Sequence, residues 1–324
     1  METTRVAIVG AGPIGLELAA ALKLAGIDYL QFDASSIGAT IAWYPQQMLF
    51  HSNAERLAIA GVAIQTADQQ KPTREEYLAY LRAVVLQYGL AIRSYEQVLS
   101  VTPRPEGGFD VVTSRSAIHA EFVVIAIGSM HRPRLLGIPG ESLPHVSHYF
   151  QEPHPYFGQR LVIIGGKNSA VEAAIRCQRA GAEVTLAYRR ADFSPEHLKF
   201  WLLPEIRSMV RDERVRVLFS HTPTEIRERS VVFDSPDGPA EVPADFVLSL
   251  TGYEQDTSLL ENAGVEFHGT ARVPRYDEAT METNVAGLFI AGTAIQGSPV
   301  GHVRVIVENC HIHVPRIVAA LESR

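Results

Sequence analysis

The chain has 324 residues, of which 46% are hydrophobic and 20% are charged, and its formal net charge is −7. The length favours two domains, and the composition is that of a globular protein and not of a disordered one. The acidic balance argues against nucleic acid as a ligand, and no apolar run has the length of a membrane span. The two cysteines, Cys177 and Cys310, lack the spacing of a disulfide framework or a zinc site. We therefore expect a cytoplasmic protein with no metal and no nucleic-acid or membrane partner.

The first predicted unit is a strand, a glycine turn, a helix and a second strand. Val6–Val9 predicts the first strand, Leu16–Ala25 the helix and Ile27–Asp33 the second strand. The turn at Gly10–Gly15 reads GAGPIG, a complete G-x-G-x-x-G. Its glycines permit a tight turn, a close approach of a pyrophosphate and the packing of helix on strand, and the helix N-terminus attracts phosphate. Asp33 ends the second strand, where a carboxylate accepts hydrogen bonds from free ribose hydroxyls.

The segments that follow predict a helix, a meander, a strand and a long irregular crossing. Thr73–Tyr88 reads as an amphipathic helix between a proline and a glycine. Val98–Val101 and Phe109–Thr113 predict paired strands, and Phe122–Ile127 is a continuous apolar strand. Ser129–Phe157 is rich in proline and histidine and lacks periodicity, which indicates a crossing between domains.

A second copy of the strand, turn, helix and strand pattern lies at Arg160–Tyr188. Its turn, Gly165–Ala170, reads GGKNSA, with Lys167 in place of the second glycine and Ala170 in place of the third. The Lys167 side chain must point away from a bound pyrophosphate or contribute a cation to it. Arg189 and Arg190 follow the second strand, at the place that Asp33 has in the first unit.

The charges after the two turns differ, and this difference predicts two ligands. Guanidinium groups bind a 2′-phosphate through charge-assisted, bidentate hydrogen bonds, whereas a carboxylate repels it. Arg189 and Arg190 therefore predict NADPH at the second turn, and the alternative is a solvated arginine pair on a loop. A chain that holds one nucleotide with free ribose hydroxyls and one with a 2′-phosphate suits a flavin and a nicotinamide donor.

The remaining elements complete the predicted layout. Phe246–Leu250 and Gly287–Ala291 predict apolar strands, and Val303–Leu321 predicts a terminal helix. We expect an α/β protein of two Rossmann-like, three-layer domains, the second inserted in the first. The predicted FAD-binding domain covers 1–150 and 245–324, and the NADPH-binding domain covers 151–244.

The chain also resembles a known family over nearly its whole length. It is similar to the thioredoxin-reductase-like flavoproteins and, within them, to the bacillithiol-disulfide reductase family. The stretches that carry the resemblance are Lys71–Arg74, Ile138–Glu141, His148–Phe150, Glu152–Phe157, Ile164–Glu172, Leu203–Glu205, Thr251–Tyr253 and Val307–Asn309.

The resemblance implies which residues hold each cofactor. For FAD they are Gly10, Gly12, Pro13, Ile14, Gly15, Asp33, Ala34, Ser52, Val98, Ala126, Gly128, Gly292 and Thr293. For NADPH they are Gly166, Lys167, Asn168, Ser169, Arg189, Arg190 and Gly252. Thr293 stands where related proteins have an aspartate for the ribityl chain.

The chain departs from its relatives at the residues that reduce disulfides. Thioredoxin reductases carry a C-x-x-C pair near the segment that here reads Tyr149–Tyr156, which has no cysteine. The bacillithiol-disulfide reductases carry a cysteine in the first turn, at the position of Ile14. Cys310 is then the candidate thiol nucleophile, and Cys177 reads as a small core residue. His51 is a candidate proton donor near the flavin by family analogy.

The predicted function is an FAD-dependent NADPH oxidoreductase that passes electrons to an acceptor such as bacillithiol disulfide or a related low-molecular-weight disulfide. One alternative is a ferredoxin or flavodoxin–NADP reductase, which shares the fold and lacks the dithiol. Another is a non-enzymatic redox-sensing protein that binds the nucleotides without turnover. The acceptor is expected to be a small molecule or small protein, and the enzyme a homodimer or homotetramer.

Overall fold

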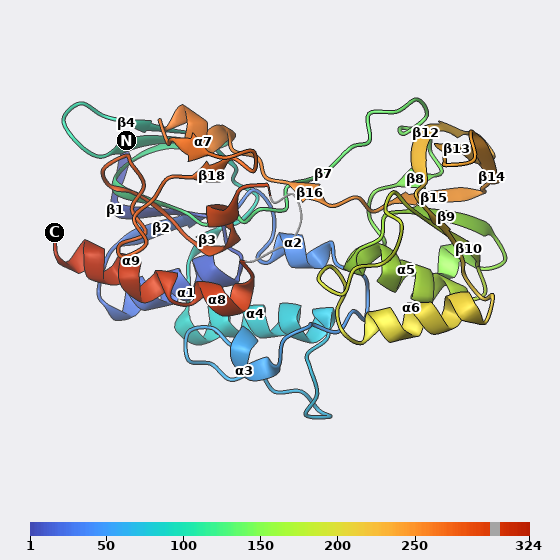
Figure 1. Ribbon diagram of the computed structural model, residues 1–324. Helices are drawn as coiled ribbons and strands as arrows, with labels where there is room; N and C mark the ends of the chain where they lie inside the picture. The colour runs from blue at the N-terminus through green and yellow to red at the C-terminus, as the bar shows by residue number, and fades with distance from the viewer. Residues whose placement is uncertain (299–304) are drawn as a thin grey trace. The chain divides into compact units, whose positions relative to one another are not determined.

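A computed structural model describes residues 1–298 and 305–324, which form two compact units (Figure 1). The first unit contains Met1–Trp43, Gln47–Arg132 and Glu254–Arg324, and the second contains Tyr44–Gln46 and Pro133–Tyr253. Most of the second unit is therefore an insertion in the first. Across the described ranges, no helix is long and apolar enough to cross a membrane.

The first unit is built on a seven-stranded sheet in the order β3-β2-β1-β6-β5-β4, in which β19 also pairs with β6. Its strands are β1 (Glu2–Val9), β2 (Tyr29–Phe32), β3 (Ile92–Arg93), β4 (Val98–Pro103), β5 (Phe109–Thr113), β6 (Ala117–Ile125) and β19 (Leu288–Ile290). Strands β2, β1, β6 and β19 run parallel, so their carboxyl ends meet at one edge of the sheet. The predicted meander is the antiparallel pair β4 and β5.

Helices cover this sheet. They are α1 (Pro13–Leu24), α2 (Ala39–Ala42), α3 (Ala54–Leu57), α4 (Arg74–Tyr88), α7 (Ser258–Asn262), η2 (Gly292–Gln296), α8 (Val307–Cys310) and α9 (His313–Glu322). Figure 1 shows α1, α4 and α9 along one side of the sheet, where α1 packs against both of the others. On the other side α7 contacts β4, close to the short pair β17 (Phe267–His268) and β18 (Val273–Pro274).

The predicted helix Thr73–Tyr88 shows how local sequence determines an element. Thr73 accepts a hydrogen bond from Glu76 N and the Glu76 carboxylate accepts one from Thr73 N, which is a capping box. Gly89 ends the helix in the left-handed conformation, with φ 57°. Tyr77, Tyr80, Leu81 and Val84 form its buried face.

The second unit has a five-stranded parallel sheet in the order β11-β10-β9-β15-β8. Its elements are β8 (Val146–Ser147), η1 (His154–Tyr156), β9 (Arg160–Ile164), α5 (Asn168–Arg179), β10 (Glu183–Tyr188), α6 (Leu202–Arg211), β11 (Arg216–Phe219) and β15 (Phe246–Ser249). A three-stranded antiparallel sheet completes it: β12 (Thr222–Arg227), β13 (Ser230–Asp234) and β14 (Ala240–Pro243).

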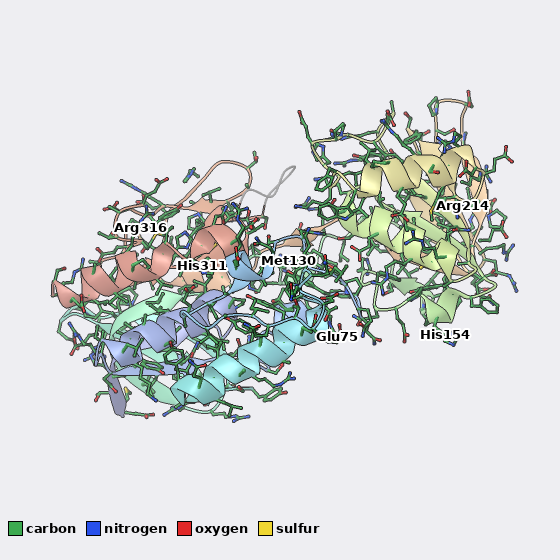
Figure 2. All side chains as sticks on the ribbon, turned by 90° about the horizontal axis from the view of Figure 1, so that it is seen from below. Glu75, Met130, His154, Arg214, His311 and Arg316 are labelled. Carbon is green, nitrogen blue, oxygen red and sulfur yellow. The ribbon has the colours of Figure 1, made fainter. Side chains whose placement is uncertain are left out.

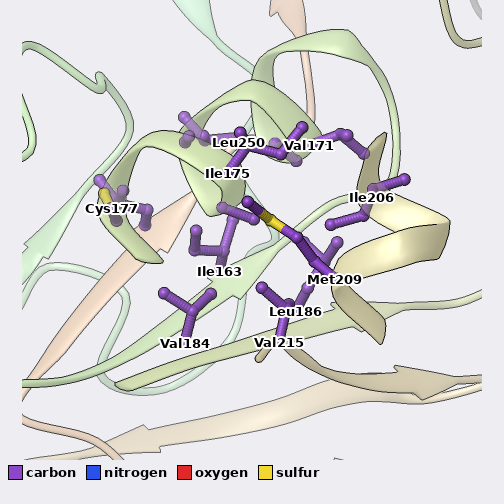
Figure 3. Close-up of a cluster of buried hydrophobic side chains, with 14 of the residues drawn as sticks. Ile163, Val171, Ile175, Cys177, Val184, Leu186, Ile206, Met209, Val215 and Leu250 are labelled. Carbon is purple, nitrogen blue, oxygen red and sulfur yellow. The ribbon is translucent and has the colours of Figure 1, made fainter. Parts of the chain in front are cut away.

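Alternate side chains of β9 face two different cores in the second unit. Leu161 and Ile163 belong to the cluster formed with α5 and α6, which Figure 3 shows. Val162 and Ile164 belong to the cluster formed with the three-stranded sheet. A strand that is apolar on both faces is typical of a parallel sheet covered on both sides, and it gives this unit its three layers.

The unit boundaries differ from the predicted domain boundaries of 150 and 245. They fall at Arg132–Pro133 and Tyr253–Glu254, where β7 (Arg132–Pro133) pairs with β16 (Tyr253–Glu254). The reason is that β15 pairs with β8 and β9 and so belongs to the second sheet. The sequence of an apolar strand such as Phe246–Leu250 does not indicate which of the two sheets the strand joins.

The C-terminal segment also differs from its prediction. The helix predicted at Val303–Leu321 is two helices, α8 and α9, and residues 303 and 304 lie outside the described residues. The two helices are separated by His311 and Ile312.

Candidate functional site

Three loops meet at the carboxyl edge of the first sheet. Ala126 N donates to Val9 O at 2.8 Å, and Ala291 N donates to Ile125 O at 2.9 Å. The glycine turn Gly10–Gly15 follows β1, and Ala126–Gly128 and Gly292–Thr293 follow β6 and β19. The structure thus brings together three segments of the predicted flavin site that are far apart in the sequence.

Each of the three positions in this turn is a glycine for a different physical reason. Gly10 has φ +112°, and a Cβ there would lie 2.5 Å from Ala126 O. A Cβ at Gly15 would lie 2.2 Å from Gly10 O. Gly12 has φ −74°, and no atom of the described residues lies within 4 Å of a Cβ built there. The fold requires the first and third glycines, whereas Gly12 has open space where a side chain would lie, so a ligand could approach the backbone there.

Asp33 fixes the turn from the end of β2. Its Oδ2 accepts from Ala11 N at 2.7 Å, and its Oδ1 accepts from Ser35 N at 2.8 Å. Burial raises the pKa of Asp33, while these two hydrogen bonds act in the opposite direction. Each carboxylate oxygen has a second lone pair for a ribose hydroxyl. Asp33 O also accepts from Glu96 N at 2.9 Å, which places Val98, two residues further on, in the strand that begins beside this corner.

Thr293 and Ile14 lie next to glycines of the neighbouring loops. A Cβ at Gly128 would lie 3.5 Å from Thr293 Oγ1, and a Cβ at Gly292 would lie 3.5 Å from Ile14 Cβ. Gly292 N donates to His313 Nδ1 at 3.1 Å. Burial lowers the pKa of His313 to about 4, so the imidazole is neutral and can accept this bond. His313 is not among the flavin-site residues that the sequence predicted, and its contact with Gly292 N is seen only in the fold.

The second glycine turn is shaped by its own sheet. Gly165 has φ +144°, and a Cβ there would lie 2.6 Å from Leu250 O. A Cβ at Gly166 would lie 2.3 Å from ring atoms of Tyr188. The Tyr188 ring also stacks on Phe193, with 6.2 Å between centroids. Both glycines are therefore required by packing, and Tyr188 holds the turn against β10.

Positive charge gathers at the N-terminus of α5. Lys167 is its N-cap residue, and the pKa of Lys167 is lowered by burial and by the charges of Arg190, Arg134 and Arg189. Arg189 and Arg190 are exposed, as is Ser169, whereas Asn168 Oδ1 accepts from Lys199 N at 2.9 Å. Gly252 O accepts from Arg134 N at 2.9 Å. The predicted residues of the second site thus lie together, and Arg134 is an addition that the sequence did not reveal.

The family model for pyridine nucleotide-disulphide oxidoreductases matches residues 7–292. The chain belongs to this family. Bacilliredoxin reductase Bdr of Bacillus subtilis is 38% identical over 325 residues, which cover 100% of this chain and 99% of the relative. A ferredoxin–NADP reductase of Ignicoccus hospitalis is 28% identical over 88% of each chain.

A solved structure extends the comparison to the fold. The bacillithiol disulfide reductase Bdr of Bacillus cereus superposes with a TM-score of 0.95 at 36% identity, over 100% of both chains. The predicted resemblance and fold class are confirmed. The chain is a flavoprotein-type oxidoreductase whose family uses a flavin and a pyridine nucleotide.

The cysteines of this family member lie inside its cores. Cys310 is fully buried, and burial raises the pKa of its thiol to about 12. A thiol with that pKa is a poor nucleophile at neutral pH, because the thiolate is the reactive form. Burial also raises the pKa of Cys177 to about 12, and its predicted place in the core is confirmed (Figure 3).

The two histidines near the C-terminus have opposite environments. His311 Nδ1 lies 2.7 Å from Glu17 Oε2, and His311 Nε2 lies 3.0 Å from Arg56 O. Both partners are acceptors, so the ring favours the doubly protonated form, and the Glu17 hydrogen bond raises the pKa of His311. This pair joins the segment between α8 and α9, where Figure 2 labels His311, to α1. Throughout the described ranges, no group of three or more His, Cys, Asp or Glu is arranged to hold a metal.

His51 and Ser52 lie in the segment that leads into α3, and both are partly buried. Phe50 N donates to Pro72 O at 2.9 Å, which attaches this segment to the start of α4. The roles assigned to His51, Ser52 and Cys310 stay predictions.

Proposed function

We propose that this enzyme binds FAD on its first unit and NADPH on its second, and reduces a low-molecular-weight disulfide such as bacillithiol disulfide. The observation that carries the cofactor assignment is the contrast between Asp33 after the first turn and four cations around the second. When bound, the flavin takes a hydride from the nicotinamide and supplies two electrons to the acceptor. With a disulfide, one NADPH and one proton yield NADP⁺ and two thiols.

The first turn fits the pyrophosphate and ribose of FAD. Gly12 leaves room for the phosphates, and the first turn of α1 offers N–H groups and a positive dipole end. Asp33 would accept from the ribose, and Gly128, Gly292 and Thr293 would line the flavin side of the same edge. Ala34, Ser52, Val98 and Ala126 complete the proposed set.

The second turn fits a nucleotide that carries more negative charge. Lys167, Asn168 and Ser169 would hold the pyrophosphate, and Arg189 and Arg190 would hold the 2′-phosphate. Gly166 and Gly252 would let the backbone approach the ligand.

The relatives support a disulfide as the acceptor, because two of them are named for bacilliredoxin and for bacillithiol disulfide. Ile14 stands where the bacillithiol-disulfide reductases carry a cysteine, and Cys310 is buried. We therefore propose that the acceptor is reduced without a thiol of this chain.

The test is an acceptor screen that follows NADPH consumption, with wild type and Cys310→Ser compared. Equal rates of bacillithiol disulfide reduction support the proposal. Loss of the rate in Cys310→Ser alone would show that the buried thiol becomes accessible and acts as the nucleophile. No reduction by either protein would remove bacillithiol disulfide as the acceptor.

Ferredoxin–NADP reductase activity is the second candidate, because a relative of that name matches most of the chain. Rapid NADPH-dependent reduction of ferredoxin or flavodoxin, with no turnover of disulfides, would favour it. Two bound nucleotides with no turnover toward any acceptor would favour a redox-sensing protein instead.

We also propose a cytoplasmic homo-oligomer. Both cysteines are free and buried, which suits a reducing compartment. The expectation of a homo-oligomer rests on the resemblance. Light scattering on the purified holoenzyme measures the molecular mass. The mass of a dimer or tetramer would support a homo-oligomer, and the mass of a monomer would contradict it.

A further inference from the structure

Gln31 is an amide in the middle of the first sheet, and its side chain is fully buried. It lies in β2, where it pairs with Ile8 of β1 and with Ile92 of β3. Its partners in the sheet are apolar, and a hydrophobic side chain is the ordinary choice at such a position. The amide therefore needs an explanation beyond the filling of the core.

The Gln31 side chain contacts the first glycine turn directly. Its Nε2 donates to Gly10 O at 2.9 Å in a buried hydrogen bond. A Cβ at Gly15 would lie 3.3 Å from the same nitrogen, so the amide extends from β2 to the first turn of α1. The absence of a side chain at Gly15 thus leaves room for this amide as well as for the Gly10 carbonyl.

Gln31 and Asp33 hold the two sides of one peptide group. Gln31 Nε2 donates to the oxygen of this group, Gly10 O. Ala11 N lies on the other side of the same trans peptide and donates to Asp33 Oδ2 at 2.7 Å. Gly10 has φ +112°, and glycine has little conformational preference of its own, so the partners of the peptide must fix its orientation. Rotation of the peptide plane would break both hydrogen bonds.

The fixed peptide leads into the donors that a phosphate would use. Ala11 O accepts from Gly38 N at 3.0 Å, so Gly12 N, on the other side of that trans peptide, faces away from Gly38. Gly12 is the N-cap residue of α1, and the N–H groups of the first helical turn have no carbonyl partner within the helix. If the peptide before them could rotate, a ligand would have to order it on binding, at a cost to affinity.

Stability does not explain the Gln31 amide. Its Oε1 is buried and has no hydrogen-bond partner among the described residues. An unpaired buried acceptor costs at least as much free energy as one hydrogen bond contributes. The fold therefore gains nothing on balance from the amide, whereas the orientation of the Gly10 carbonyl depends on it.

We propose that Gln31 is a positioning residue for the flavin: it fixes the peptide between Gly10 and Ala11 and so preorganises the first turn for the pyrophosphate of FAD. Gln31 acts on the ligand through the backbone of the turn and does not touch it. This inference rests on the proposed FAD site of the first unit, and it adds to that site a residue outside the glycine motif.

The experiment measures the Kd of FAD by fluorescence titration of the full-length apoprotein, together with the Tm of the apoprotein. Gln31→Met keeps the length of the side chain and removes the donor. Its Kd is expected to rise about tenfold, because the peptide is then held on one side only. The Tm is expected to stay close to that of wild type, since Met also removes the unpaired oxygen.

Gln31→Glu makes the same contact depend on pH. A protonated carboxyl can donate to Gly10 O, whereas a carboxylate is an acceptor only. Burial raises the pKa of such a carboxyl into the neutral range or above. The Kd of this variant, divided by that of wild type at the same pH, is therefore expected to rise about tenfold between pH ~6 and pH ~9. The same ratio for Gln31→Met is expected to be independent of pH.

Thr4→Val is the matched control. Thr4 is buried, and its Oγ1 donates to Asp28 Oδ2 at 2.9 Å. The substitution keeps the shape of the side chain and removes a hydrogen bond at the amino end of β1, far along the strand from the glycine turn. The Kd of FAD is expected to stay as in wild type at every pH.

Two results would overturn the inference. One is a Gln31→Met protein that binds FAD as tightly as wild type does. The other is a Gln31→Glu protein that binds FAD as weakly as Gln31→Met at every pH, which would mean that the amide only fills space. If Gln31→Met does not fold, the pH dependence of Gln31→Glu decides alone. Failure of the proposed function is distinguishable, because the wild-type apoprotein would then not bind FAD at all.

Discussion

His311 and His313 are two residues apart and respond to pH in opposite directions. His313 is neutral because burial lowers its pKa to about 4, and it accepts from the backbone of Gly292. His311 lies between two acceptors, and the pKa of its ring is raised. His313 positions a loop of the proposed flavin site, and His311 joins α1 to the C-terminal helices.

The pH dependence of stability follows from His313. Between pH ~6.5 and pH ~4 the unfolded chain binds a proton on this ring that the folded chain does not. As the pH is lowered through that window, the free energy of unfolding is therefore expected to decrease, and His313 contributes up to about 3 kcal/mol of this decrease. His313→Gln keeps an acceptor for Gly292 N and removes the titration. Urea unfolding should show a steeper acid loss in wild type than in the variant, and parallel pH profiles would contradict the account.

His311 is expected to make the free energy of unfolding change with pH in the opposite direction. Its folded pKa is raised, so its contribution is present below the unfolded value and is lost as pH rises through the folded value. His311→Asn is expected to destabilise the protein more near pH ~6 than near pH ~9. Thermal unfolding at the two pH values measures this, and an equal loss at both would show that the ring is not charged.

Replacement of the Asp33 carboxylate is expected to cause a selective loss of flavin. Asp33→Asn keeps the size of the side chain but can satisfy only one of its two backbone donors as an acceptor. We expect the affinity for flavin to fall by about 10- to 100-fold, since a charged hydrogen-bond acceptor is lost. Flavin content per protein and titration of the apoprotein check this, and Asp28→Asn, which lies at the amino side of β2, is a control that should retain flavin.

Within the first glycine turn, one glycine is required for folding and another is expected to be required only for binding the ligand. Gly10→Ala places a Cβ 2.5 Å from Ala126 O at a positive φ, so it is expected to destabilise the fold by a few kcal/mol. Gly12→Ala meets no described atom within 4 Å and is expected to fold as wild type, with flavin affinity reduced at least tenfold. Tm and flavin content measure the two effects. A Gly12→Ala protein with full flavin content would contradict the assignment of this turn.

Both strand, turn and helix units could be predicted from sequence because their signals are local. Glycines at fixed spacing, the proline and glycine on either side of Thr73–Tyr88, and the arginine pair after β10 each lie within one short segment. The place of β15 could not be predicted, since a doubly buried strand has the same apolar pattern in either sheet. Arg134 and His313 were missed because their contacts, with Gly252 and Gly292, depend on tertiary folding.

At the scale of the whole molecule, the same unit is used twice with opposite charge. In the proposed function, the carboxylate at the first turn and the cluster of cations at the second select two different nucleotides for one redox reaction. Replacing both Arg189 and Arg190 by Gln is expected to reduce the preference for NADPH over NADH by about 100-fold, because two charge-assisted contacts to the 2′-phosphate are lost. The ratio of kcat/KM values for the two nucleotides measures it, and an unchanged ratio would mean that the arginine pair is only solvated.

The proposed function requires one chain to hold a flavin and a pyridine nucleotide and to pass a hydride between them. Anaerobic mixing of the purified holoenzyme with NADPH, followed through the visible absorbance of the flavin, tests it most directly. We expect rapid and complete bleaching with NADPH and much weaker binding of NADH. A flavin that keeps its absorbance at saturating NADPH would contradict it.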